Sequence, residues 1–101
     1  MPKMQDFTAY HNGEWKKWSD VWIDPLDLGF VLGDTVFETL RTFNGKPYIW
    51  QEHIDRIYRS LKYTRMECGM NPEEMYGMLV EGINRNKEFL KECGDLNIWL
   101  Q

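Results

Sequence analysis

Residues 35–50 read TVFETLRTFNGKPYIW, and this stretch decides the fold of the chain. Its first nine residues are mostly β-branched or aromatic, which predicts a strand over residues 35–43. The dipeptide Asn44-Gly45 favours a tight hairpin turn, so residues 46–50 are expected to return as a second strand. Because side chains alternate along a strand, one face carries Phe37, Thr39, Arg41 and Phe43, and the other Val36, Glu38, Leu40 and Thr42. Neither face is purely apolar.

A second hairpin is expected before this one. Residues 7–10 and 14–18 have strand-like composition and flank a polar break that contains Asn12-Gly13, another turn-forming dipeptide. Between the two hairpins, residues 24–29 contain proline and glycine and are expected to form a loop. The first half of the chain is therefore expected to be rich in β-structure.

The second half of the chain has helical periodicity. Between residues 51 and 63, apolar residues recur at helical spacing and form one stripe: Ile54, Ile57, Tyr58 and Leu61. A second helix is expected to begin with Asn71 as its N-cap, Pro72 at its first position and Glu74 three residues after the cap. Residues 96–101 return to a strand pattern.

Together these segments predict a small two-layer α/β domain. Its sheet would be mixed but mostly antiparallel, built from the two hairpins plus the C-terminal strand, with two helices packed on it. The 101 residues leave room for one domain only. The sequence stops inside the last predicted strand, and an exposed apolar strand invites edge pairing, so we expect it to be the front part of a longer protein.

Composition and charge argue against several classes of function. The 12 Lys+Arg and 16 Asp+Glu give a formal net charge of −4, which provides no basic surface for nucleic acid. No apolar run approaches the ~18 residues of a membrane span, and the N-terminus lacks the apolar segment of a signal peptide, so a cytoplasmic location is expected. Cys68 and Cys93 form no metal-binding pattern and are expected to be reduced.

Two arginines are candidates for binding an anion. With the apolar stripe of the first helix facing the core, His53, Arg56 and Ser60 form a separate polar stripe that can face a cleft. The planar guanidinium of Arg56 is suited to a phosphate, but periodicity alone favours a solvated flank. Arg41, on the predicted strand, can meet a substrate carboxylate or form an ion pair with a neighbouring Asp or Glu; the sequence leaves both open.

Four segments in this order resemble the class IV, or fold type IV, pyridoxal-phosphate aminotransferases. The family comprises branched-chain aminotransferases, D-amino-acid aminotransferases and aminodeoxychorismate lyases. The resemblance lies in residues 12–14 (NGE), 27–41 (DLGFVLGDTVFETLR), 44–47 (NGKP) and 52–60 (EHIDRIYRS). It covers nearly the whole chain and implies that residues 1–101 are the N-terminal small domain of such an enzyme, ahead of the catalytic large domain.

The resemblance also implies roles for individual residues. Arg56 matches the arginine that holds the phosphate of the cofactor, pyridoxal 5′-phosphate (PLP). Glu38 and Arg41 match a pair that is frequent in this strand, with Glu38 in a supporting role. Four positions are assigned to the substrate pocket: Leu32, Phe37, Thr39 and Arg41.

The resemblance implies a homodimeric enzyme that moves an amino group between an amino acid and a 2-oxo acid. A branched-chain substrate is our first choice because Leu32, Val36 and Phe37 suggest an apolar pocket; a D-amino-acid aminotransferase and an aminodeoxychorismate lyase are the alternatives. The Schiff-base lysine of the family lies in its second half, so no catalytic residue is expected in this chain, and the chain alone is expected to be inactive. If 101 residues are the natural length, a non-enzymatic α/β binding domain is the remaining possibility.

Overall fold

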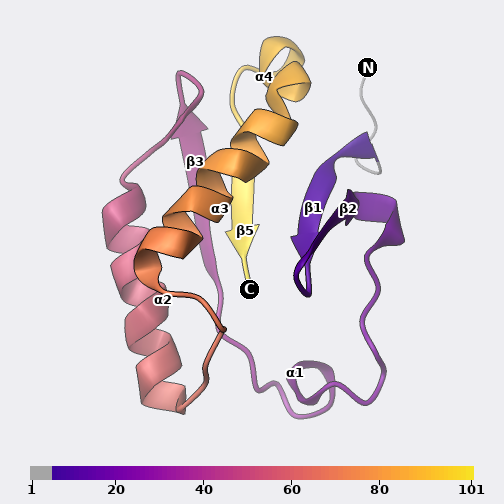
Figure 1. Cartoon of the computed structure of the whole chain (residues 1–101), viewed down its shortest axis with the longest axis vertical. Coiled ribbons are helices and arrows are strands. Elements are labelled where there is room, and N and C mark those ends of the chain that lie inside the picture. Colours follow the sequence, from indigo (N-terminus) through magenta and orange to yellow (C-terminus); the bar gives the residue numbers. More distant parts are fainter. Residues whose placement is uncertain (1–5) are drawn as a thin grey trace.

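The strand expected at residues 35–43 is the central strand of the larger of two sheets in the computed structural model, which describes residues 6–101. The mixed α/β class, with both hairpins and the last strand, is confirmed (Figure 1). In chain order the elements are β1 (Thr8–His11), β2 (Glu14–Lys17), η2 (Trp18–Asp20), α1 (Leu28–Val31), β3 (Glu38–Phe43), β4 (Lys46–Pro47), α2 (Trp50–Thr64), α3 (Pro72–Arg85), α4 (Lys87–Cys93) and β5 (Asn97–Leu100).

The larger sheet has the order β4-β3-β5, and both pairings are antiparallel. Glu38 lies opposite Leu100, the last residue of β5. Residues 35–37 therefore have no paired strand beside them, and β3 begins at Glu38 rather than at Thr35 as the composition predicted. The extent of a strand depends here on its partner as well as on its own residues.

The turn between β3 and β4 follows its sequence signal closely. Asn44 and Gly45 have φ angles of 53° and 77°, the left-handed pair that a tight hairpin turn requires. The second strand is shorter than predicted, because β4 comprises only Lys46–Pro47. Ile49 then adopts a φ of 51°, and α2 starts at Trp50, so the chain turns away from the sheet where a longer strand was expected.

The first hairpin forms a sheet of its own, so the predicted strands divide between two sheets. β1 and β2 pair with each other and pack against α3. The Trp15 ring lies over Gly82, 3.6 Å from the position a Cβ would take there, and the Arg85 guanidinium lies 4.6 Å from the ring centroid. The Asn86 amide donates to the Thr8 carbonyl at 2.9 Å and its oxygen accepts from the Thr8 N–H at 2.8 Å, which ties β1 to the end of α3.

Helices α2 and α3 cover one face of the larger sheet, with α3 crossing β3 and β5 in Figure 1. The stripe predicted for α2 is confirmed, because Ile54, Ile57 and Leu61 are buried. The predicted start of α3 is also confirmed, with Asn71 and Glu74 forming a reciprocal capping box before Pro72. The buried apolar residues come from β3, α2 and α3: Leu40, Ile54, Ile57, Leu61, Met75, Leu79 and Ile83.

The region expected to be a loop contains one helical turn. α1 starts after Asp27, whose carboxylate accepts a hydrogen bond from the Gly29 N–H at 2.8 Å. The prediction from Pro25 and Gly29 missed this N-cap, which was present in the sequence. None of the helices in residues 6–101 is both long enough and apolar enough to cross a membrane.

Candidate functional site

The alternation of β3 decides which candidate residues can act together. Leu40 and Thr42 are buried beneath the helices, whereas Thr39 and Arg41 are exposed on the opposite face of the sheet. Phe37 lies on that open face too, with its ring stacked on Trp99 of β5 at 5.4 Å between centroids. The predicted division of residues between the two faces is therefore confirmed.

Glu38 points away from the open face and meets α2. Its carboxylate accepts two hydrogen bonds from Arg56, with Nε at 2.9 Å from Oε2 and Nη2 at 2.8 Å from Oε1. His53 places Nδ1 2.8 Å from the same Oε1 atom. The Glu38 side chain is 12% exposed and that of Arg56 54%, so the guanidinium lies at the outer edge of this cluster.

Glu38 and Arg56 each stabilise the charged form of the other. The hydrogen bond from Arg56 lowers the pKa of Glu38; burial works in the opposite direction, and His53 lowers the pKa further. The same pairing raises the pKa of Arg56. Because an ionised carboxylate only accepts hydrogen bonds, Nδ1 of His53 carries the proton in this contact.

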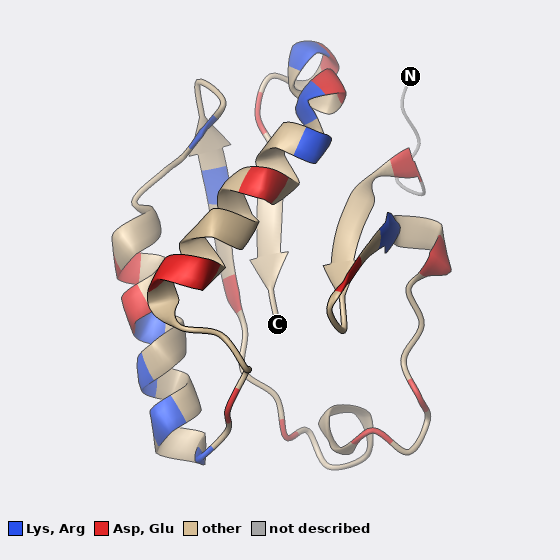
Figure 2. Ribbon diagram, viewed as in Figure 1, with Lys and Arg blue, Asp and Glu red and all other residues tan. Residues whose placement is uncertain are grey.

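Arg56 also lines an open groove of about 620 Å³. The other walls are residues 35–37, which approach β3, and four residues further along α2: Arg59, Ser60, Tyr63 and Thr64. The lining residues include two arginines and several hydroxyl groups and no carboxylate. Figure 2 shows the basic residues gathered along the later part of α2. Such a lining favours an anion.

The predicted polar stripe is only partly in the groove. Arg56 and Ser60 line it, whereas His53 turns toward Glu38 and does not. Sequence reasoning missed Arg59 and Tyr63, although their spacing of three and seven residues from Arg56 places them on the same side of a helix. This helical spacing from Arg56 was the feature of the sequence that could have identified Arg59 and Tyr63.

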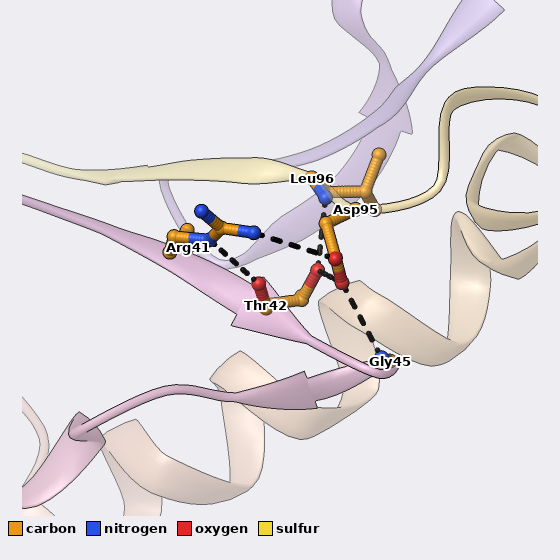
Figure 3. A network of polar contacts seen from close by, with 5 residues as sticks. All are labelled: Arg41, Thr42, Gly45, Asp95 and Leu96. Carbon is orange, nitrogen blue, oxygen red and sulfur yellow. Dashed lines mark hydrogen bonds and ion pairs between the residues drawn. The ribbon is translucent and has the colours of Figure 1, made fainter.

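Arg41 takes part in a different network, at the turn end of β3 (Figure 3). Its guanidinium lies 3.4 Å from Asp95 and its Nε donates to the Thr42 carbonyl at 3.0 Å. The Thr42 hydroxyl donates to Asp95 at 2.7 Å and accepts from the Leu96 N–H at 2.9 Å. Asp95 also accepts from the Gly45 N–H at 3.4 Å. The ion pair, one of the two interpretations of Arg41, is the one found in this chain.

The predicted pocket residues do not all come together. Phe37, Thr39 and Arg41 share the open face of the sheet, and Phe37 also borders the groove. Leu32 is 67% exposed in the segment after α1 and does not line the groove. Cys68 and Cys93 are free, as expected, and no cluster of metal-ligating side chains occurs among residues 6–101.

The depressed pKa of Glu38 predicts a pH dependence of stability. A carboxyl group whose folded pKa lies below its ordinary value of 4.5 stabilises the fold above that value, and this stabilisation is lost as the pH falls toward the folded pKa. We expect the free energy of unfolding in urea to fall between about pH 5 and about pH 3. Glu38→Gln should make this fall shallower, and an equally steep fall in the variant would contradict the prediction.

A model of the family described as amino-transferase class IV matches residues 35–101, which span the groove, the Glu38 cluster and the Asp95 network. The chain therefore belongs to the class IV aminotransferase family.

The relatives it resembles within the family carry the names of three different enzymes. Over 77 residues it is 34% identical to a putative branched-chain-amino-acid aminotransferase of Methanocaldococcus jannaschii, covering 76% of this chain and 27% of that protein. It is 37% identical to the aminodeoxychorismate lyase of Bacillus subtilis over 70 residues, which cover 69% of this chain and 24% of that protein. It is 45% identical to a D-alanine aminotransferase of Listeria innocua over 68 residues, which cover 67% of this chain and 24% of that protein. The matched part is thus about a quarter of each relative.

Proposed function

We propose that residues 1–101 are the N-terminal small domain of a PLP-dependent aminotransferase, in which Arg56 binds the phosphate of the cofactor. The observation that carries this proposal is that Arg56 pairs with Glu38 and also lines a groove that holds a second arginine and no carboxylate. Arginine binds phosphate through paired N–H donors and stays charged at any working pH. The residues present therefore fit a phosphate group.

PLP, when bound, acts as an electron sink that allows a bond to Cα of an amino acid to break. The residues of this chain contribute binding and orientation. Arg56 holds the phosphate in the groove, and Phe37 and Thr39 present an apolar ring and a small side chain on the adjoining sheet face. Leu32 is included in the proposed pocket on the family resemblance alone, since this residue is 67% exposed and does not line the groove.

The substrates of the complete enzyme are an amino acid and a 2-oxo acid in this proposal. A branched-chain amino acid is preferred because Phe37, Val36 and Leu32 offer apolar surface, and the similarity to the M. jannaschii protein supports this choice. The relatives named as D-alanine aminotransferase and aminodeoxychorismate lyase support the alternatives. Assays with L- and D-amino acids and with aminodeoxychorismate distinguish the three.

We also propose that the protein is a cytoplasmic homodimer. The segment around α1 carries an unusual run of large apolar side chains that are more than half exposed: Trp22, Ile23, Leu26, Leu28, Phe30, Val31 and Leu32. Exposed apolar surface of this extent is typical of an interface.

The 101-residue chain mixed with PLP should show no amino transfer above the rate of free PLP. A nucleophilic lysine needs desolvation or a cationic neighbour to lower its pKa. Among residues 6–101, all lysines are exposed except Lys16, which is half-buried and pairs with Glu14 at 3.7 Å. Transfer is measured as 2-oxo acid formed from leucine, with free PLP as the control. Turnover above that background would mean that a lysine of this chain is active.

A further inference from the structure

The contact between Glu38 and Arg56 has a geometry that fixes a guanidinium. Glu38 engages Nε and Nη2, each with a different carboxylate oxygen, at 2.9 and 2.8 Å. A pair of parallel hydrogen bonds of this kind fixes the guanidinium plane as well as its distance. Arginine has five N–H donors, and the two on Nη1 have no protein partner among the described residues. They remain available to a ligand.

Glu38 is itself held firmly, so it can position a more mobile partner. It lies in β3 opposite Leu100, its side chain is 12% exposed, and His53 donates to its Oε1 atom at 2.8 Å. Arg56 is 54% exposed and makes its ion pair within the described residues with Glu38 alone. A long, exposed arginine side chain loses rotamer freedom when it binds, and a partner that orders it beforehand reduces this cost.

The position of the groove decides how the carboxylate affects a bound anion. Arg56 lines the groove, whereas Glu38 and His53 do not. A phosphate in the groove therefore meets the Arg56 side chain rather than the negative oxygens of Glu38. In this arrangement Glu38 orients Arg56, at the cost of some repulsion between its carboxylate and the bound phosphate.

We infer that Glu38 is a positioning residue, which acts through Arg56 to hold the guanidinium in the orientation that binds the cofactor phosphate. This inference rests on the proposed function of Arg56. It also separates Glu38 from Arg41, with which the family resemblance paired it, because Arg41 points to the opposite face of β3 and contacts Asp95.

The test is the dissociation constant of PLP in the natural full-length protein, measured for Glu38→Ala, Arg56→Ala and the double variant, with the melting temperature of each. We expect Glu38→Ala to weaken PLP binding about tenfold. In the Arg56→Ala background the same change should weaken it no further, because Glu38 then has nothing to position. Glu38→Gln, which keeps one acceptor oxygen, should recover part of the affinity; if the alanine variant does not fold, the glutamine variant carries the test.

The Arg85–Glu81 pair on α3 provides a control, because it is also an arginine–glutamate ion pair, with a single 2.8 Å contact away from the groove. Glu81→Ala should leave PLP affinity unchanged. If Arg56→Ala weakens PLP binding but Glu38→Ala leaves the PLP affinity unchanged or raises it, the positioning role of Glu38 is wrong and the proposed function of Arg56 stands. Equal weakening by Glu38→Ala with and without Arg56 also overturns the role, because the effect is then structural. If Arg56→Ala has no effect, both proposals fail.

Discussion

Replacing Arg56 with alanine in the full-length protein should weaken PLP binding about ten- to a hundredfold, which is the usual effect of losing hydrogen bonds between charged groups. The substitution removes the guanidinium from the groove wall and leaves Arg59 as the remaining cation in the lining. The measurement is the PLP retained after dialysis, read from its absorbance and compared with wild type.

Lys62→Ala is the matched control for this experiment. Lys62 lies on the same helix, is exposed and does not line the groove. Its removal changes the net charge by the same amount as the loss of Arg56, so a general effect of charge would appear in both variants. Equal PLP retention in the two would remove Arg56 from the cofactor site.

Thr42→Val should produce a large loss of stability for a substitution that keeps the shape of the side chain. Thr42 is 0% exposed, and its hydroxyl both donates to Asp95 at 2.7 Å and accepts from the Leu96 N–H at 2.9 Å. Valine has nearly the same shape but lacks the hydroxyl, so the Asp95 carboxylate loses a donor and the Leu96 N–H loses its acceptor. We expect the free energy of unfolding to fall by about 2–3 kcal/mol, as for the loss of buried hydrogen bonds.

Thr39→Val controls for the loss of a hydroxyl and for strand propensity. Thr39 lies on the same strand, three positions earlier, with its side chain on the open face. Its replacement should change the free energy of unfolding by less than about 0.5 kcal/mol. Urea unfolding of the two variants measures both values, and equal losses would show that the Asp95 network contributes little to the fold.

Local features of the sequence were sufficient to predict most of the secondary structure. Both Asn-Gly turns, the apolar stripe of α2 and the capping box of α3 depend on residues close together in the chain, and all of them are found. The failures concern the bounds of strands, the division of the strands between two sheets, and a short helix in a segment expected to be a loop. β3 begins opposite Leu100, the last residue of its partner β5. α1 begins after Asp27, whose capping contact was not anticipated because Pro25 and Gly29 indicated a loop.

The candidate site was less accessible to sequence reasoning because its contacts link distant residues. Glu38 and Arg56 are 18 positions apart, and Thr42 and Asp95 are 53 apart. Alternation placed Glu38 and Arg41 on different faces, but only the packed structure shows that each has an ionic partner of its own. The sequence identified Arg56 as a candidate without indicating what orients it.

Native mass spectrometry of the protein from its natural source tests the central claim most directly, because one spectrum gives both polypeptide mass and bound cofactor. The proposal predicts a subunit several times heavier than the 12.2 kDa of these residues, carrying one PLP. A 12.2 kDa polypeptide without PLP would contradict the claim that this chain is the phosphate-binding domain of an aminotransferase.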